Sequence, residues 1–572
     1  MSRRQVATAR SSQLVSTYGV GSLFPAVDDS VMICGLDHWP APSPHERVDE
    51  VRLARACGVS TFHAPPRGRT KYGDVPVVRF PDYYFCPHCR RLGLRRSFCR
   101  EDENKCPGPD CGVSIMPSRF VAACSRGHIE DFPYFAWVHR GQEYAEVTDH
   151  QMSLRSLGRS SALSDLVVHC SCGVGSRSLA GIFGTAALKG IASCRGRRPW
   201  FPEAENEECG EPLRTLQRGS SNVWFPVVRS ALSIPPWTEE AARVVARHHP
   251  QLVDMEPDQR TEWIRAFASK HVTEQALIAA VRARFGEDET PPSSDLDIRE
   301  EEYAALVEGK EEAGHGQQFV CRPREYASGH GPKGIISVAD VARLREVRAL
   351  QGFSRLVPWA QGDDDRHLAS LAAGGTTWLP AVETLGEGVF LRFDPAAVSA
   401  WEATPFATSR VDAIEVSRAA ADNGIGSRLD ISPRGLLLHT FAHALLDELS
   451  LDAGYAAASL RERVYDREDQ AGVLIYTASG DSAGSLGGLS AQSEAGRLER
   501  VVASMLAKAR WCSNDPVCIE SGPSGIGGLN IAACHACLLL PETSCERFNL
   551  VLDRACLVGT PAELDGGFFP RE

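Results

Sequence analysis

The spacing of apolar and polar positions predicts both helices and strands in the central and C-terminal parts of the chain. Apolar residues that recur every three or four positions predict helices, at 237–285, 338–350 and 433–451. Short apolar runs rich in β-branched and aromatic residues predict strands, paired at 376–383 and 387–394, with a further buried strand from 473 that enters a glycine-rich turn. The mixture of elements indicates an α+β protein.

A chain of 572 residues is too long for one hydrophobic core, because cores stop growing at about 250 to 300 residues. An acidic stretch rich in Pro and Ser at 286–298 is typical of a linker. We expect ribbon-like zinc modules packed on a larger mixed α/β domain with a helical insertion. The expected parts are an N-terminal segment packing on the core (1–80), a cysteine-rich region with two zinc modules (81–230), a helical insertion and acidic linker (231–298), a mixed α/β core (299–500) and a four-cysteine zinc-binding domain (501–572).

Composition and charge limit the classes of function. No run of about 18 apolar residues predicts a membrane span, and the basic N-terminus lacks the apolar stretch of an export signal, so we expect a cytoplasmic protein. The net charge of −12 argues against a nucleic-acid binder that uses its whole surface, because phosphate contacts need clustered Lys and Arg. Any contact with DNA must therefore be local.

The cysteines gather at the two ends of the chain. Of 19 cysteines, twelve precede residue 210 and six follow residue 511. In a reducing cytosol such grouping favours metal ligands over disulfides. The sequence therefore predicts structural Zn²⁺, at two to three sites.

The first group has the C-x2-C knuckle spacing of a zinc ribbon, in which four thiolates close a tetrahedron and leave no position for water. Its members are Cys86, Cys89, Cys106 and Cys111. The alternative is buried free thiols. Cys99 is the most plausible substitute ligand, and Cys124 with His128 could form a separate half-site or have a packing role.

Two further groups follow. The second has a less diagnostic C-x-C spacing and consists of Cys170, Cys172, Cys194 and Cys209. The third contains a C-x2-C knuckle and consists of Cys518, Cys534, Cys537 and Cys545, with Cys512 and Cys556 as possible replacements. We interpret His535, inside this knuckle, as a surface residue or one that supports the ligands.

His439 and His443 are four residues apart on a predicted helix and share one face. A catalytic metal site with Asp447 as third ligand is one interpretation, although Thr440 stands where zinc proteases carry their general base. The apolar residues around them favour packing histidines instead. The Gly- and Ser-rich segment 476–489 matches no phosphate-binding motif and is interpreted as a structural loop, so the chain has no motor of its own.

Basic residues are dense within the first cysteine group, where aromatic residues accompany them. In nucleic-acid binding, arginine side chains commonly contact phosphates and aromatic rings commonly stack on bases. The alternative is that these arginines pair with the acidic residues at 101–103. The candidate nucleic-acid-binding residues are Arg90, Arg91, Arg95, Arg96, Arg197 and Arg198, and Arg100 belongs to the same patch.

Taken in order, the motifs resemble the DrmB family of the bacterial DISARM anti-phage system over nearly the whole chain. They are SSQLVSTYGVGSLF, GLDHW, CPHC, CSRGHIEDFP, CRGRRPW to RGSSN, WLPAVETLGEGVF, LLHTFAHALL, RERVYD, IYTASGDSAGSLGGL and CHACLLLPETSCERFNLVLDR. Val20 departs from the proline expected after the first glycine. The C-terminal part resembles the zinc-binding domain of MrfA-type DNA repair helicases, whose pattern is met by Cys518, Cys534, Cys537, Cys545, Asn549, Leu552, Asp553 and Arg554.

The resemblance implies a non-catalytic accessory subunit that partners a helicase-like ATPase, DrmA, and helps it to engage DNA. The runner-up is a metal-dependent phosphodiesterase or nuclease that uses the His-x3-His helix. A third hypothesis, a DNA sensor acting alone, is disfavoured by the acidic net charge.

Overall fold

The computed structural model is a multi-domain α+β protein. It describes residues 5–27, 29–68, 74–99, 104–108, 111–141, 150–158, 160, 162–270, 272–285, 294–311, 317–327, 331–359, 363–420, 429–477 and 487–569. The chain forms two compact units, each built from several segments. Unit 1 contains residues 1–47, 63–228 and 349–382, and unit 2 contains residues 48–62, 229–348 and 383–572. The finer five-part division expected from the sequence stays a prediction.

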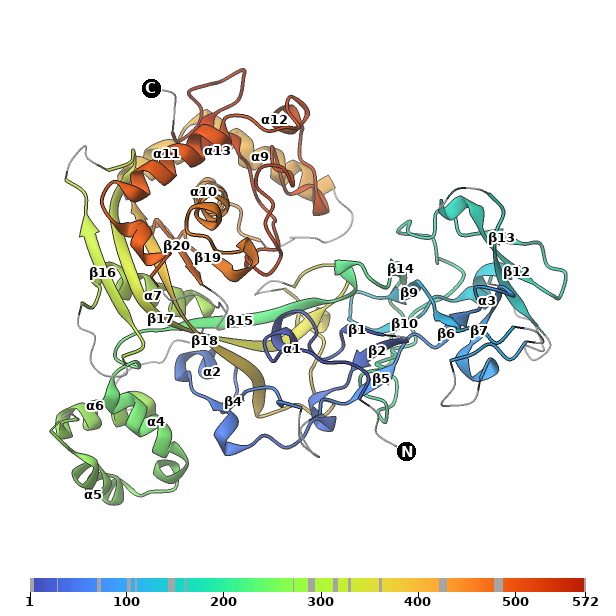
Figure 1. The fold of residues 1–572 in the computed structure, drawn as a ribbon, viewed down its shortest axis with the longest axis horizontal. Helices are drawn as coiled ribbons and strands as arrows, with labels where there is room; N and C mark the ends of the chain where they lie inside the picture. The colour runs from blue at the N-terminus through green and yellow to red at the C-terminus, as the bar shows by residue number, and fades with distance from the viewer. Residues whose placement is uncertain are drawn as a thin grey trace. The chain divides into compact units, whose positions relative to one another are not determined.

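Unit 1 consists mainly of small antiparallel sheets (Figure 1). Their strand orders are β1-β2-β5, β10-β9-β14 and β13-β12-β11-β7-β6-β8. The strands are β1 Leu23–Ala26, β2 Asp29–Ile33, β5 Val77–Arg79, β6 Tyr83–Phe85, β7 Arg91–Leu94, β8 Met116–Pro117, β9 Phe120–Ala123, β10 Ile129–Asp131, β11 Met152–Ser156, β12 Leu166–Cys170, β13 Arg177–Ser178 and β14 Arg214–Gln217; the helices are α1 Gln13–Ser16 and α3 Tyr134–Val138.

The largest sheet of the described part of the chain has the order β15-β17-β18-β20-β19, with β16 on β17 and the β3–β4 pair on β18. The unit boundaries fall within β3, β4, β15, β17 and β18. The strands are β3 Arg47–Val48, β4 Thr61–His63, β15 Phe225–Ser233, β16 Val320–Glu325, β17 Ile335–Ser354, β18 Trp378–Phe393, β19 Leu460–Tyr465 and β20 Gly472–Thr477.

Helices supply most of the core of unit 2. They are α2 Val51–Ala56, α4 Glu240–Val253, α5 Pro257–Phe267, α6 Glu274–Phe285, α7 Asp295–Glu308, α8 Pro395–Glu402, α9 Pro405–Ala420, α10 Pro433–Asp452, α11 Arg497–Ala509, α12 Val517–Glu520 and α13 Ala555–Val558. Helices α4 to α6 form a small cluster with a core of its own, which confirms the amphipathic helices predicted at 237–285 (Figure 1).

Helix α10 is the centre of unit 2. The Ser432 side chain caps it by accepting a hydrogen bond from the Gly435 N–H at 3.0 Å, and Pro433 occupies its first turn. Buried residues lie on every side of it, as expected for a helix surrounded by other elements. Strands β19 and β20 and helices α9, α11 and α13 contact it (Figure 1), and the helix predicted at 433–451 is confirmed.

Two predicted elements were wrong. Residues 338–350 belong to β17 rather than to a helix, because charged residues that periodicity places in solvent, such as Arg345 and Glu346, are buried and paired in the sheet. The strand pair at 376–383 and 387–394 is one continuous strand, β18. Gly386 does not make a turn; a side chain there would collide with Thr477 of β20. The predicted buried strand is β20, whereas 478–486 of the glycine-rich turn and 286–293 of the linker lie outside the described residues.

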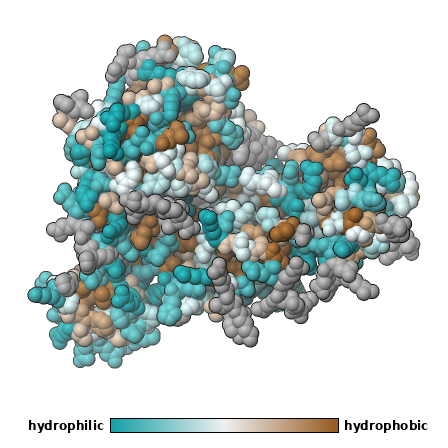
Figure 2. Space-filling view, in the orientation of Figure 1, coloured by the Kyte–Doolittle hydropathy of each residue, from teal (hydrophilic) through white to brown (hydrophobic). Residues whose placement is uncertain are grey.

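On the face drawn in Figure 2, hydrophilic residues are interspersed with smaller hydrophobic areas. Within the described residues, no helix is long and apolar enough to cross a membrane.

Candidate metal centres

Cysteine and histidine side chains, joined in one case by a glutamate, converge in compact groups of four. Within each group the ligand atoms lie within 4.8 Å of one another. A tetrahedral zinc ion would place two sulfurs about 3.8 Å apart and a sulfur and a nitrogen about 3.5 Å apart. In the described part of the chain the groups are Cys86/Cys89/Cys106/Cys111, Cys124/His128/Cys194/Cys209, His139/His150/Cys170/Cys172, Cys512/Cys518/Cys534/Cys537 and His439/His443/Glu462/Cys545.

The first group has the four cysteines predicted from their spacing. The β6–β7 hairpin presents Cys86 and Cys89, with Cys86 Sγ 3.4 Å from Cys111 Sγ and Cys89 Sγ 3.6 Å from Cys106 Sγ. Burial raises the pKa of Cys106 to about 12, whereas at Cys86 burial is outweighed by hydrogen bonds, first that from the Cys89 N–H, so that its pKa falls to about 7. A divalent cation would favour the ionised form of all four thiols. Cys99 lies outside this group.

The second predicted group is not brought together, and its four cysteines are divided between two sites. Cys194 and Cys209 join Cys124 and His128, which the β9–β10 hairpin holds close. His128 Nδ1 lies 3.4 Å from Cys124 Sγ and 3.6 Å from Cys194 Sγ. Its Nε2 lies 2.9 Å from Glu207 Oε2, the carboxylate–histidine arrangement that orients metal-binding histidines. Cys124 and His128, which the sequence suggested as a half-site, therefore belong to a group of four potential ligands.

The other two cysteines meet two histidines that the sequence reasoning missed. Cys170 Sγ lies 3.4 Å from His150 Nδ1, and Cys172 Sγ lies 3.3 Å from His139 Nε2. The register of the β11–β12 hairpin is the feature that would have revealed His150. Because Met152 pairs with Cys170, His150 lies beside Cys172. His139 follows α3 and has no ligand-like spacing in the sequence, so only the fold reveals it.

In the C-terminal group Cys512 takes the place predicted for Cys545. Cys512 Sγ lies 3.5 Å from Cys534 Sγ, and Cys518 and Cys534 lie 3.8 Å from Cys537. These separations fit a closed zinc site. Although burial opposes ionisation, hydrogen bonds from the Ala536 N–H and neighbouring groups lower the pKa of Cys534 to about 7.

Asp515 explains why Cys512 reaches the site. Its carboxylate accepts from the Cys512 N–H at 2.6 Å and pairs with Arg554 at 2.6 Å, which folds the loop back toward Cys534. Cys556 was the other candidate replacement. It is buried and points to Asp553 instead.

The last group combines His439 and His443 of α10 with Glu462 of β19 and Cys545. His439 Nε2 lies 3.1 Å from Glu462 Oε1 and 3.3 Å from Cys545 Sγ, and the group is almost inaccessible, with exposed fractions from 0% to 4%. Burial lowers the pKa of His439, which favours a neutral ring. Asp447, the third ligand of the catalytic interpretation, is exposed and outside the group.

The chain is similar to known proteins along most of its length. A domain of unknown function, DUF8724, matches residues 10–225, and the MrfA Zn-binding domain matches residues 441–538. DISARM protein DrmB of Bacillus paralicheniformis is 31% identical over 568 residues, which cover 94% of this chain and 97% of that protein. The chain belongs to the DrmB family. The matched MrfA-type domain contains all four cysteines of the C-terminal group, so zinc binding fits both the family and the geometry.

The predicted nucleic-acid-binding arginines differ in their surroundings. Arg90 and Arg96 are exposed. Arg91 lies over the Phe98 ring at 5.2 Å, and Arg95 donates to Asn104 Oδ1 at 3.1 Å. Arg100 lies outside the described residues. Arg90 and Arg96 are thus the members of this patch that face solvent.

The remaining two arginines of the predicted set are paired with acidic residues. Arg197 contacts Asp82 at 3.3 Å and Asp131 at 3.6 Å, and Arg198 contacts Glu207 at 2.7 Å. Their charges are compensated within unit 1, so we expect them to attract a phosphate less strongly than Arg90 and Arg96 do.

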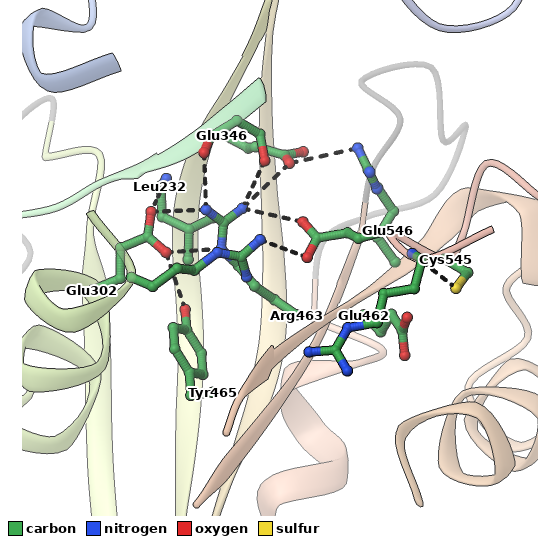
Figure 3. A network of polar contacts seen from close by, with 12 residues as sticks. Leu232, Glu302, Glu346, Glu462, Arg463, Tyr465, Cys545 and Glu546 are labelled. Atoms are coloured by element: carbon green, nitrogen blue, oxygen red, sulfur yellow. Dashed lines mark hydrogen bonds and ion pairs between the residues drawn. The ribbon is translucent and has the colours of Figure 1, made fainter. Parts of the chain in front are cut away.

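A buried ion network lies beside Glu462 and Cys545 of the last metal group (Figure 3). Arg463 of β19 and Glu302 of α7 are both 0% exposed and joined by two hydrogen bonds of 2.8 and 2.9 Å. Glu346 and Glu546 face the same guanidinium group at 3.8 and 3.6 Å. The network joins α7, β17, β19 and the C-terminal segment of unit 2, so we interpret it as structural.

Proposed function

We propose that this protein is a non-catalytic accessory subunit of a DISARM defence complex in the cytoplasm. In this proposal it binds a helicase-like ATPase of the DrmA type and contributes contacts to DNA. The supporting observation is the 31% identity to DISARM protein DrmB over 94% of the chain. The sequence contains no phosphate-binding loop, so ATP-driven movement is assigned to the partner.

The metal groups support a structural rather than a catalytic use of zinc. Each group offers four protein ligand atoms, whereas catalytic zinc sites keep a position for water or substrate. A closed site contributes its binding free energy to folding. The zinc modules of unit 1 would then fix the ends of short strands, among them β6, β7, β11 and β12.

The exposed arginines indicate where DNA would be contacted. Arg90 and Arg96 belong to the first zinc module, where closed coordination fixes the backbone that carries them. Two phosphate contacts suit a protein whose net charge is −12, because they add local attraction without requiring a basic surface overall.

The geometry argues against the runner-up, a nuclease built on His439 and His443. Both rings are 0% exposed, and Glu462 and Cys545 occupy the space beside them. A phosphodiester would have no approach to an ion at this position.

The test is the DNA-stimulated ATPase rate of the cognate helicase with and without this chain, with this chain alone as a control. We expect the rate to rise in the complex, no turnover by the lone chain, and a smaller rise with the double variant R90A/R96A. R510A, which removes an exposed arginine of unit 2, is the matched control and should behave like the wild type. No effect on the helicase, or hydrolysis by the lone chain, would refute the proposal.

A further inference from the structure

His439, His443, Glu462 and Cys545 come together from three separate parts of unit 2. The histidines lie one turn apart on α10, Glu462 lies on β19, and Cys545 follows 106 residues after His439. The interatomic distances are 3.1 and 3.5 Å from Glu462 Oε1 to the two Nε2 atoms, and 3.3 Å from His439 Nε2 to the sulfur. Around a tetrahedral zinc ion such separations would be about 3.3 to 3.5 Å.

The hydrogen bonds of the two rings fix which nitrogens carry protons. His439 Nδ1 lies 3.0 Å from the Val551 carbonyl oxygen and His443 Nδ1 lies 2.9 Å from the Leu538 carbonyl oxygen. A carbonyl only accepts, so each Nδ1 must donate. In a neutral ring the Nε2 atom then presents a lone pair, and both Nε2 atoms point toward Glu462.

The lone pair of His443 Nε2 faces a carboxylate oxygen, which is an acceptor, instead of a donor. His443 Nε2 and Glu462 Oε2 are buried, and within the described residues neither has a hydrogen-bond partner. Leaving such atoms buried without a partner is unfavourable, and more so for a charged group. A single cation at the centre would satisfy both.

Burial and the neighbouring Glu462 raise the pKa of the Cys545 thiol, so an ion beside it would be needed to hold it as a thiolate. The Cys545 sulfur accepts from the backbone N–H groups of Arg547 and Asn549, each at 3.3 Å. Hydrogen bonds to the charged form of a group favour that form. One thiolate, one carboxylate and two neutral imidazoles would together exactly balance a divalent ion, so that the buried site carries no net charge.

We propose that His439, His443, Glu462 and Cys545 bind one divalent transition-metal ion, zinc by the softness and geometry of this donor set. The site is separate from the four-cysteine group in the same unit, and His439 and Cys545 lie outside the residues that match the MrfA Zn-binding domain. Its ion ties α10 to β19 and to the C-terminal segment. Four protein ligands leave no vacancy, so the ion is structural.

The first experiment counts metal in the purified full chain by plasma mass spectrometry and native mass spectrometry. We expect E462Q and C545S each to lose one equivalent of zinc relative to the wild type. D447N is the matched control, because Asp447 lies one turn further along α10 but is exposed, and it should keep the wild-type content. Unchanged zinc in both E462Q and C545S would overturn the proposal.

Because these variants remove buried ligands, they can fail to fold. A second measurement therefore uses the wild-type protein: anomalous scattering on either side of the zinc absorption edge, with the four-cysteine site as an internal reference. A peak among the four side chains supports the proposal even where the variants fail to fold. Signal at the four-cysteine site with none between His439 and Cys545 would overturn it.

Discussion

Replacing Arg463 by methionine would remove the cation at the centre of the buried ion network. Both oxygens of Glu302 lose their bond to the guanidinium group and keep only the Leu232 N–H at 2.8 Å and the Tyr465 hydroxyl at 3.3 Å. The carboxylate of Glu346 loses a counter-charge as well. Breaking a buried pair in this way costs about 3–5 kcal/mol, because a charge is left in a medium of low dielectric constant.

The assay is urea unfolding of the zinc-loaded protein, followed by tryptophan fluorescence and circular dichroism. R463M should lose about 3–5 kcal/mol, and the double variant R463M/E302Q should recover more than half of it, because the stranded charge is gone. R467M removes an exposed ion pair with Glu300 two residues beyond the end of the same strand and should cost no more than about 1 kcal/mol. If R463M costs as little as R467M, or if the double variant is no more stable than R463M, the reasoning is wrong.

Three further predictions follow from individual contacts. Burial opposes ionisation of Glu346, but neighbouring guanidinium groups, first that of Arg461, lower its pKa below the usual value. Its folded-state pKa is thus below its unfolded value of about 4.3, so it stabilises the protein above that pH and the contribution disappears as the pH falls through the folded pKa. As the pH is lowered below 5, E346Q should therefore lose less of its free energy of unfolding than the wild type does, as measured by urea titrations at each pH. If the two proteins lose the same amount, the inferred direction of the pKa shift is wrong. C106S should lose one zinc equivalent and become sensitive to proteolysis around β6 and β7, whereas C99S should keep its zinc, and equal metal content in the two variants would exclude the first site as drawn. For DNA binding by the complex with its helicase, R90A/R96A should reduce the slope of log affinity against log salt by about 2; fluorescence anisotropy at several salt concentrations measures it, and an unchanged slope would remove these residues from the interface.

Cysteines that are close along the chain and were predicted as metal ligands do lie together in the structure. Cys86 and Cys89 share one hairpin, and Cys534 and Cys537 one turn, so their spacing already restricts the geometry. The prediction failed where the members of a group come from separate elements. The pairing of β11 with β12 brings His150 to Cys172, and no spacing rule contains that register. Cys545 was placed with the nearest knuckle, although the fold turns it toward α10.

The difference between local and tertiary information also explains which predicted helices and strands were right and which were wrong. Helix α10 has a capping serine, a proline at its start and a long apolar run, so local signals and tertiary packing agree. In β17 the apolar spacing at Val338, Val341 and Val347 suits a helix, but pairing with β16 and β18 and the burial of paired charges make it a strand. Tertiary pairing of this kind is not visible in a single sequence.

Helix α10 is covered by the last residues of the chain. Leu538, Leu550 and Leu552 belong to its apolar surroundings, and the Phe569 ring lies 5.8 Å from that of Phe441. During synthesis the ribosome makes α10 about a hundred residues before these covering residues, so a 20-residue apolar helix stays without its cover until they have been made. A truncation that removes residues 538–572 should therefore leave unit 2 exposed to aggregation and proteases, because it uncovers the apolar surface of α10.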